Sequence, residues 1–269
     1  MLYKYCRKDG FDILENSRLR LSRIKCLNDP FELVFGIDKD SAHLNLRNEY
    51  EEDPNIIRTW SATLDGQRIS HNRASPEDIL DKFTKFQISD FRRVFGILRE
   101  KWNRTMGIAC MSEAMDVIQM WAHYADNHKG IVVGIEENEF VKNRESIIPV
   151  CYRDKMVLFP VTGHLGRLDE IAIKLFPEVL SRKETNWSYE KEIRLYASLD
   201  EPDNDEQYYI EMPRSAIREV YLGLRSDQTM RMTAEQIRGD EQYRHLRIFK
   251  MIQHESAFKL TPQEILQKS

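Results

Sequence analysis

The sequence lacks the short motifs that carry several common enzyme chemistries. It contains no GxGxxG or GxxxxGK[ST] loop that could cradle phosphates, and no GxSxG turn that could present a nucleophilic serine. These absences argue against Rossmann oxidoreductases, P-loop NTPases and ordinary α/β-hydrolases. They leave open an enzyme of another type.

Cysteine and histidine are too few and too scattered to indicate a metal site. The four cysteines form no CxxC pair, so the sequence predicts neither a zinc site nor a disulfide framework. His123 and His128 are five residues apart, whereas the two histidines of an HExxH helix are four apart. We therefore expect no metal. The cysteines are Cys6, Cys26, Cys110 and Cys151.

Long apolar runs are also missing. No stretch of about 18 apolar residues could span a membrane, and the first residues, MLYKYCRKDGF, lack the apolar core of a signal peptide. The formal net charge is −4, so the chain has no global basic signature of a nucleic-acid binder, although a local basic groove stays open. With 31% charged and 41% hydrophobic residues, we expect a globular protein of the cytoplasm that does not associate with membranes.

Short strands and helices alternate irregularly along the 269 residues, which favours a mixed α+β domain. Strands are predicted at 1–5, 19–22, 106–113, 130–135, 147–152, 189–197, 208–213, 216–223, 245–252 and 257–262. Helices are predicted at 11–18, 75–102, 117–128, 166–183 and 233–239. Ser75 and Pro76 start the second, Lys129-Gly130 ends the third, Pro177 interrupts the fourth and Gly239 ends the last. An acidic turn is predicted at 200–207. We expect a single domain over 1–269 with a mainly helical insertion at about 40–105.

The predicted strand at 189–197 alternates between two kinds of side chain. Ile193, Leu195 and Ala197 share the parity that would face a core, because successive side chains on a strand point to opposite faces. The residues of the other parity are Glu190, Glu192, Arg194 and Tyr196. A solvated outer face of the sheet is the ordinary interpretation of such charged residues. Two like charges on one face nevertheless repel unless a cation lies between them.

A second set of polar and aromatic residues occupies 111–130. Trp121 and Tyr124 have helical spacing and are more often core residues than a cofactor platform. His123 is more often a structural histidine than a catalyst. Ser112 follows a buried strand, where it could cap a helix or hold a ligand.

Five short motifs stand in order along the chain: LYKY at 2–5, LNDPFE at 27–32, MSE at 111–113, MWAHYADNHKGIVVGI at 120–135 and WSYEKEIRL at 187–195. Together they resemble a large bacterial family known as domain-of-unknown-function family 2971. In that family an arginine follows YKY directly, whereas here Cys6 stands before Arg7.

The order of these motifs also resembles the ADP-ribosyltransferase superfamily. Its members open with a strand bearing LYH or a similar triplet, continue with a strand ending in Ser or Tyr, and finish with a strand bearing Glu-x-Glu or Gln-x-Glu. Here LYKY, ACMSE and EKE stand in that order. The resemblance implies an ADP-ribosyltransferase-like mixed β-sheet and NAD as a substrate.

The same resemblance implies roles for individual residues. Glu192 would stabilise the positive charge that develops on the ribose as nicotinamide leaves, and Glu190 would orient or deprotonate the acceptor. The resemblance also implies residues that contact NAD. Lys4 stands where LYH has its histidine, with Tyr3 and Tyr5 as alternates on the same short strand. Ser112 matches the serine of the second motif, and Arg194 would neutralise both glutamates. The other candidates for contact with NAD are Asn28, Asp29, Trp121, His123 and Tyr124. For each of them a purely structural role stays open, such as a turn at Asn28 and Asp29.

Enzymes of this kind in bacteria frequently serve as toxins in toxin–antitoxin or anti-phage defence systems. The resemblance therefore implies a macromolecular target and a possible antitoxin protein as partners. Loose basic clusters at 91–104 and 243–250 favour a nucleic-acid target slightly over a protein. The alternatives are a metal-dependent nuclease, an NAD glycohydrolase and a non-catalytic interaction module with the same fold.

Overall fold

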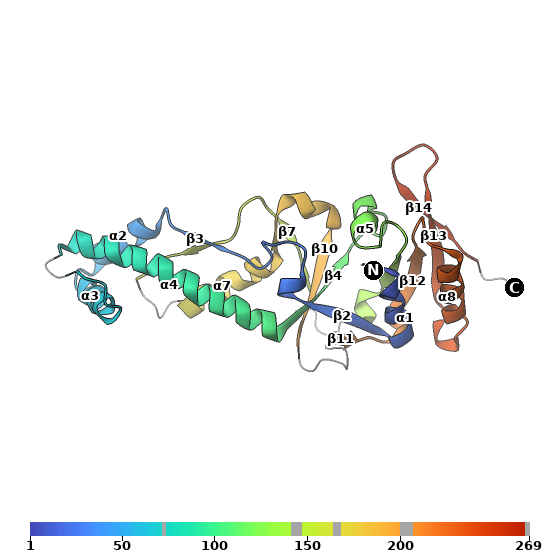
Figure 1. The fold of residues 1–269 in the computed structure, drawn as a ribbon, viewed down its shortest axis with the longest axis horizontal. Helices are drawn as coiled ribbons and strands as arrows, with labels where there is room; N and C mark the ends of the chain where they lie inside the picture. The colour runs from blue at the N-terminus through green and yellow to red at the C-terminus, as the bar shows by residue number, and fades with distance from the viewer. Residues whose placement is uncertain (72–73, 141–146, 164–167, 200–206, 267–269) are drawn as a thin grey trace. The chain divides into compact units, whose positions relative to one another are not determined.

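The computed structural model describes residues 1–71, 74–140, 147–163, 168–199 and 207–266. The chain forms two compact units (Figure 1). Unit 1 comprises residues 1–28, 105–152 and 183–269, and unit 2 comprises residues 29–104 and 153–182. Of the acidic turn expected at 200–207, all but Gln207 lies outside the described residues.

Unit 1 is built on a mixed sheet, so the α+β prediction is confirmed. Its strands follow the order β11-β2-β4-β1-β5-β12-β13-β14, with β10 beside β4 and β6 beside β10. Neighbouring strands are antiparallel except β12 and β13, which are parallel. The strands are β1 (Leu2–Cys6), β2 (Arg18–Arg23), β4 (Met106–Ser112), β5 (Ile131–Ile135), β6 (Ile147–Pro149), β10 (Glu192–Ser198), β11 (Tyr208–Glu211), β12 (Ile217–Leu222), β13 (Arg247–Gln253) and β14 (Leu260–Glu264).

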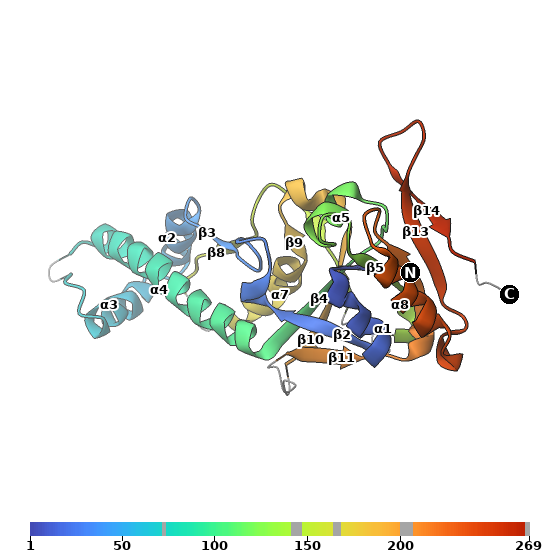
Figure 2. The same cartoon turned by 45° about the vertical axis from the view of Figure 1, so that its right-hand side comes forward.

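The helices of unit 1 are short, and α1, α5 and α8 are labelled in Figure 2. Helix α8 contacts β12. The described helices of this unit are α1 (Asp12–Asn16), α5 (Ile118–His123), α6 (Glu137–Phe140) and α8 (Gln228–Arg238), with the 3-10 helix η5 (Thr185–Glu190). The two-residue strand β7 (Cys151–Tyr152) pairs with β9 (Arg182–Lys183).

The central strand β5 is buried along its whole length because both faces of the sheet are covered. Val133 packs in a core with Leu14 of α1 and Ala234 of α8. Val132, which points to the opposite face, packs with Trp121 of α5 and Tyr5 of β1. The second face therefore carries the segment around α5, where sequence analysis placed several candidate residues.

Helix α5 is shorter than the helix predicted at 117–128. It ends at His123, and Asp126, Asn127 and His128 have φ angles of 47°, 51° and 69°. Asp, Asn and His are the non-glycine residues that adopt this left-handed conformation most readily. Gly130 then passes so close to β1 that a Cβ atom there would lie 2.1 Å from the carbonyl oxygen of Cys6.

Strand β10 begins at Glu192, so the prediction of a strand from 189 was wrong at its start. Residues 185–190 form η5 instead, and Lys191 adopts a left-handed conformation with φ 44°. Glu190 and Glu192 are thus not successive residues of one strand face. A local turn, which alternation of charge cannot reveal, sets their relative orientation.

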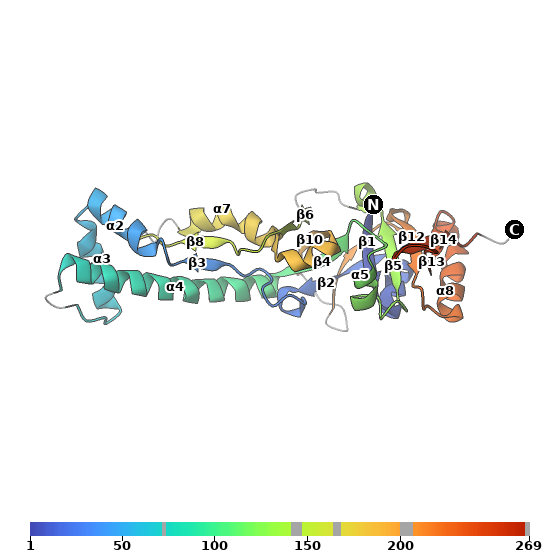
Figure 3. The ribbon, with the colours of Figure 1, turned by 90° about the horizontal axis from the view of Figure 1, so that it is seen from above.

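In the described residues, unit 2 contains helices and a short two-stranded ribbon. Figure 3 shows β3 and β8 side by side along α4. The predicted helix start is confirmed: Ser75 Oγ accepts a hydrogen bond from the backbone of Asp78 at 3.2 Å, and Pro76 opens a continuous 30-residue helix. The elements are β3 (Gly36–Asp38), α2 (Ala42–Glu52), α3 (Ile56–Gly66), α4 (Pro76–Thr105), β8 (Leu158–Pro160) and α7 (Leu168–Ser181).

The helical insertion expected at about 40–105 corresponds to α2, α3 and α4. Unit 2 also takes in residues 153–182, which sequence analysis did not group with it. The core of this unit centres on Trp60, whose ring stacks on Phe83 with centroids 4.8 Å apart. None of the helices in the described part of the chain is long and apolar enough to cross a membrane.

Candidate active site

Two buried carboxylates share one buried cation in unit 1. Glu190 is 3% exposed and Glu192 is 4% exposed. The Nζ atom of Lys183 donates to Glu190 Oε2 and to Glu192 Oε2, each at 2.6 Å. The interpretation of these glutamates as a solvated outer face was therefore wrong. The cation that their mutual repulsion requires is present, and Lys183 provides it.

Arg194 supplies a second positive charge to the cluster. Its side chain is fully buried, and Nε donates to Glu192 Oε1 at 3.0 Å while one terminal nitrogen lies 3.4 Å from Oε2. The thiol of Cys110, which stands opposite Arg194 in the β4–β10 register, hydrogen-bonds Glu192 as well. Burial raises the pKa of that thiol. Glu192 is thus held from several sides.

The surroundings push the pKa values of the two glutamates in opposite directions. Burial opposes ionisation of Glu192, but the charges of Arg194 and Lys183 outweigh it and hold its pKa well below the usual range. Burial raises the pKa of Glu190 above its ordinary value, although Lys183 partly offsets that effect. Two neighbouring carboxylates with separated pKa values are suited to different tasks, one as a fixed anion and the other as a proton acceptor.

A polar chain leads from Glu190 to the protein surface. Tyr124 lies just after α5, and its hydroxyl donates to Glu190 Oε1 at 2.5 Å. Burial and the hydrogen bond to Glu190 raise the pKa of Tyr124, while a hydrogen bond with the exposed Asn28 lowers it. His123 is exposed, and its Nδ1 lies 3.3 Å from the hydroxyl of Tyr189. Tyr124 thus links Glu190 to the exposed Asn28, and the neighbouring His123 contacts Tyr189 of η5.

Three adjacent strands bring Tyr3, Ser112 and Glu192 into one row. Tyr3 of β1 pairs with Ser112 of β4, and Ser112 pairs with Glu192 of β10. The buried Ser112 Oγ donates to the carbonyl oxygen of Glu190 at 2.6 Å and accepts from the backbone of Ala114 at 3.1 Å. Ser112 therefore fixes the backbone of Glu190 rather than presenting a free hydroxyl.

Lys4 and Tyr3, two candidate residues on β1, point to opposite faces of the sheet. Lys4 has the parity opposite to Tyr3, and its Nζ donates to the carbonyl oxygen of Cys110 at 2.8 Å. The ring of Tyr3 meets that of Tyr221 edge to face, with centroids 6.0 Å apart. Tyr3 is the residue of the LYKY motif that shares a row with Glu192.

Tyr5 and Trp121 hold the loop between β4 and α5. The hydroxyl of Tyr5 donates to the carbonyl oxygen of Ala114 at 2.9 Å and accepts from the backbone of Val117 at 3.3 Å. Trp121 is fully buried, and its Nε1 donates to the carbonyl oxygen of Met115 at 2.8 Å. Because its ring is enclosed, Trp121 does not form an open wall of the site.

Asp29 belongs to unit 2 and shapes a turn. Its Oδ1 accepts a hydrogen bond from the backbone of Phe31 at 2.8 Å, and its carbonyl oxygen accepts from Glu32. This is the structural role that sequence analysis had left open for Asp29.

Sequence analysis missed three residues that complete the cluster. Lys183 was assigned to the end of a helix, although the demand for a cation between the glutamates was the signal that could have identified it. The ring centroid of Trp187 lies 5.0 Å from the Nζ atom of Lys183. The hydroxyl of Tyr152 accepts from the backbone of Glu192 at 2.8 Å. Lys183 occupies the space between the carboxylates that a divalent cation would need.

Within residues 1–71, 74–140, 147–163, 168–199 and 207–266, no three His, Cys, Asp or Glu side chains are grouped so that they could hold a metal ion.

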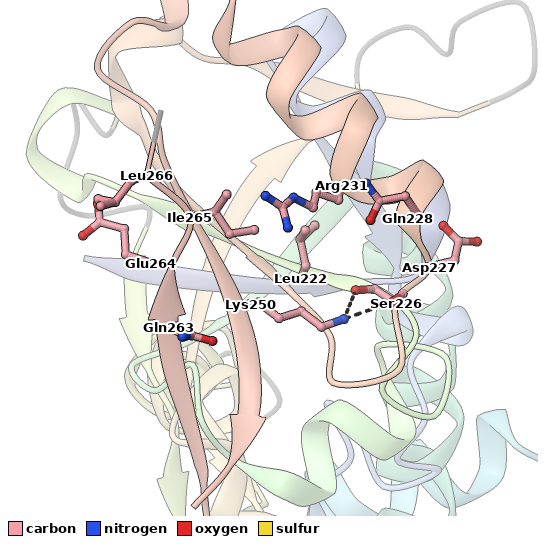
Figure 4. A pocket seen from close by; sticks show the side chains of 10 residues that line it. All are labelled: Leu222, Ser226, Asp227, Gln228, Arg231, Lys250, Gln263, Glu264, Ile265 and Leu266. Carbon is pink, nitrogen blue, oxygen red and sulfur yellow. Dashed lines mark hydrogen bonds between the residues drawn. The ribbon is translucent and has the colours of Figure 1, made fainter. Parts of the chain in front are cut away.

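A separate pocket of about 400 Å³ lies between α8 and the β13–β14 hairpin in unit 1 (Figure 4). Lys250 projects into it, but its Nζ already donates to the carbonyl oxygen of Gly223 at 2.8 Å and to the hydroxyl and carbonyl oxygens of Ser226 at 2.6 and 3.0 Å. Because an ammonium group has three protons, these contacts use its donors. Lys250 therefore braces the connection from β12 to α8.

A family model matches part of the chain. Searches of curated proteins and of solved structures gave no match. The matched part of the chain includes residues 120–123 of α5, the left-handed turn after it, β5, Lys183 and both glutamates of the cluster. Residues 120–195 match the family model described as a protein of unknown function (DUF2971), the family that the sequence motifs resemble.

Proposed function

We propose that this protein is an ADP-ribosyltransferase that cleaves NAD and transfers ADP-ribose to a macromolecule. In this proposal Glu192 is the central catalytic residue and Glu190 is the proton acceptor. The observation that carries the proposal is the pair of carboxylates that share Lys183 while their pKa values are displaced in opposite directions.

The proposed reaction breaks the bond between the ribose C1′ and the nicotinamide nitrogen. The electron pair of that bond goes to nicotinamide, which leaves as a neutral molecule, and the ribose acquires oxocarbenium character. The ionised Glu192 stabilises this positive charge, and Lys183 and Arg194 keep its carboxylate ionised and oriented. An oxygen or nitrogen of the acceptor then bonds to C1′, and Glu190 takes the proton that the acceptor releases.

The row of Tyr3, Ser112 and Glu192 agrees with the motif order of the superfamily. Tyr3, rather than Lys4, is the residue we propose for contact with NAD on the first strand, because it pairs with Ser112. Ser112 is a positioning residue, since its hydroxyl is engaged with the backbone of Glu190. Asn28, His123 and Tyr124 lie where the polar chain reaches the surface, and we propose them as contacts to the substrate.

Access to the carboxylates requires a rearrangement. Glu190 and Glu192 are buried, and the ring of Trp187 lies over Lys183. Both Trp187 and Tyr189 belong to η5, which is joined to β10 through the left-handed Lys191. We propose that side chains of η5 move when NAD binds.

The biological role that follows from this reaction is that of a toxin in a bacterial toxin–antitoxin or anti-phage defence system. A nucleic acid is the acceptor we favour over a protein. An antitoxin protein would be the natural partner, because a cell must be protected from such an activity.

The direct test is transfer of label from NAD. Wild-type protein is incubated with NAD labelled on its adenylate part and with cell extract, and the products are treated with protease or with nuclease. Wild-type protein should label a macromolecule, whereas Glu192→Gln should not, although its melting temperature should show that it is folded. Glu51→Gln, which changes an exposed glutamate of unit 2, is the matched control.

Other outcomes separate the alternatives. Release of nicotinamide without labelling would identify an NAD glycohydrolase. Degradation of nucleic acid that stops when a chelator is added would identify a nuclease. Absence of all three activities, with Glu192→Gln behaving like wild type in cells, would identify a non-catalytic module.

A further inference from the structure

A second hollow in unit 1 has a volume of about 570 Å³ and lies apart from the carboxylate cluster. The tip of the β13–β14 hairpin forms most of its wall. Residues of the β12–α8 connection, Ile118 at the start of α5 and His128 in the turn after α5 form the rest. The lining residues that matter here are Ile118, Leu224, Arg225, His128, Phe258 and Lys259.

An aromatic ring at this hollow is left entirely in solvent. Phe258 is fully exposed, and Ile118, on the opposite wall, is 38% exposed. The hairpin tip that carries Phe258 is held by backbone hydrogen bonds from His254 to Lys259 at 3.1 Å and from Lys259 to Ala257 at 2.8 Å. The backbone that carries the ring therefore forms a hydrogen-bonded turn. An exposed aromatic ring is suited to stacking on a flat apolar ligand.

The rim of the hollow is predominantly cationic. Arg225 and Lys259 are both exposed, His128 and His254 add two imidazoles, and Glu255 is the single carboxylate among the lining residues. Burial and the charge of Arg225 lower the pKa of His128, so that its ring is neutral near pH 7. The Nδ1 atom of His128 is buried and has no hydrogen-bond partner among the described residues. The wall thus combines positive charge, neutral polar groups and an aromatic face.

A single-stranded nucleic acid matches this combination. Its bases offer flat apolar faces for Phe258, and its phosphates offer negative charge for Arg225 and Lys259. A protein segment would satisfy the apolar surface but gives no general reason for the excess of positive charge. We propose that the hollow binds one or two nucleotides of single-stranded RNA or DNA, with one base stacked on Phe258.

The hollow and the carboxylate cluster are linked by one segment of chain. Ile118 begins α5 and His128 closes the turn after it, while Tyr124 between them donates to Glu190. The backbone of His128 also donates to the carbonyl oxygen of Trp121 at 3.0 Å. A strand held in the hollow would therefore lie on the same segment that contacts the site. This inference deepens the proposed function by making the acceptor a single-stranded nucleic acid.

The test is a binding assay without NAD, so that it reports on the hollow whether or not the protein has transferase activity. Fluorescence polarisation is measured with labelled single-stranded RNA and DNA 12-mers of mixed sequence at two salt concentrations. Phe258→Ala should raise the Kd roughly 10-fold, as expected from the loss of one stacked base. Changing Arg225 and Lys259 together to Ala should reduce the slope of log Kd against log salt by about 1.4, since each phosphate contact on a single strand contributes about 0.7.

Matched controls make the result decisive. Phe31→Ala removes an aromatic ring that is 59% exposed in unit 2, and Arg20→Ala removes an exposed charge of unit 1 outside the hollow and outside both basic clusters; neither should change the Kd. The proposal is overturned if wild-type protein binds neither oligonucleotide, if Phe258→Ala binds as tightly as Phe31→Ala, or if Phe258 matters only for binding to anionic vesicles. If the protein binds neither oligonucleotide but transfers label from NAD to a protein, the nucleic-acid site in the hollow is rejected and the proposed transferase activity stands.

Discussion

At the scale of single residues, Lys183 allows two buried carboxylates to coexist. Glu190 and Glu192 would repel one another in a medium of low polarity, and the Lys183 ammonium contacts both at 2.6 Å. The charges of the two glutamates raise the pKa of Lys183 although burial opposes this. With Arg194, the cluster contains two positive and two negative groups.

Replacing Lys183 by Met should therefore be strongly destabilising. Removal of one partner from a buried ion pair typically reduces the free energy of unfolding by about 3 to 5 kcal/mol. The variant should regain part of this stability on acidification, because protonation of one glutamate relieves the repulsion. Urea unfolding at about pH 7 and about pH 5 measures both effects. Lys85→Met, at an exposed position of α4, should stay within about 0.5 kcal/mol of wild type; a similarly small loss for Lys183→Met would contradict the account.

Glu192 should contribute stability that is lost in acid. Its folded pKa of about 2 lies below the ordinary value of 4.5, so this contribution is complete above about pH 4.5 and disappears as the pH falls toward 2. The difference in unfolding free energy between wild type and Glu192→Gln should thus be smaller at about pH 3 than at about pH 6. A difference that does not depend on pH would show that Glu192 has an ordinary pKa in the folded protein.

At the scale of elements, the turn at Lys191 determines the geometry of the cluster. Lys191 is exposed, has φ 44° and separates η5 from β10. Without this turn Glu190 would continue strand β10. Its side chain would then point to the same face of the sheet as that of Glu192, because residues two apart on a strand share a face. The turn instead sets the backbone of Glu190 against Ser112, whose hydroxyl bonds to it.

Substitutions at Lys191 should reveal the strain of this conformation. Glycine adopts positive φ at little cost, so Lys191→Gly should leave stability unchanged or raise it by up to about 1 kcal/mol. A β-branched residue disfavours this conformation, so Lys191→Val should lower stability by about 1 to 2 kcal/mol. Chemical denaturation of the two variants compares them directly, and equal stabilities would mean that the turn is not maintained in solution.

The sequence predicted well those elements whose pattern is local. The start of α4 followed from Ser75, Pro76 and Asp78, because capping depends on neighbours in the chain. The predicted end of α5 and the predicted start of β10 were wrong. Residues with positive φ angles follow α5 and precede β10, and such residues leave little trace in hydrophobic periodicity. Lys183 escaped notice because its contact with Glu190 and Glu192 depends on how η5 folds back.

At the scale of the whole molecule, the chain has separate cores in its two units. The four tryptophans divide evenly, with Trp60 and Trp102 in unit 2 and Trp121 and Trp187 in unit 1. Trp60 is fully buried in unit 2, where it stacks on Phe83, and Trp121 is fully buried in unit 1. Multidomain proteins commonly depart from two-state unfolding.

Trp60→Phe should therefore act mainly on unit 2. Loss of the larger ring from a fully buried position should lower the free energy of unfolding of that unit by about 1 to 3 kcal/mol. Scanning calorimetry should show two transitions in wild type, with the variant shifting one of them more than the other. One transition that moves as a whole in the variant would show that the two units unfold together.

The measurement that tests the central claim most directly is the initial rate of nicotinamide release from NAD by wild type, Glu192→Gln and Glu51→Gln, each shown to be folded. The account predicts release by wild type and Glu51→Gln, and a loss of about 100-fold or more in Glu192→Gln, as expected for removal of a charge that stabilises the transition state. Equal rates in all three proteins, or no release by wild type, would contradict the assignment of Glu192 as the catalytic residue of an NAD-cleaving enzyme.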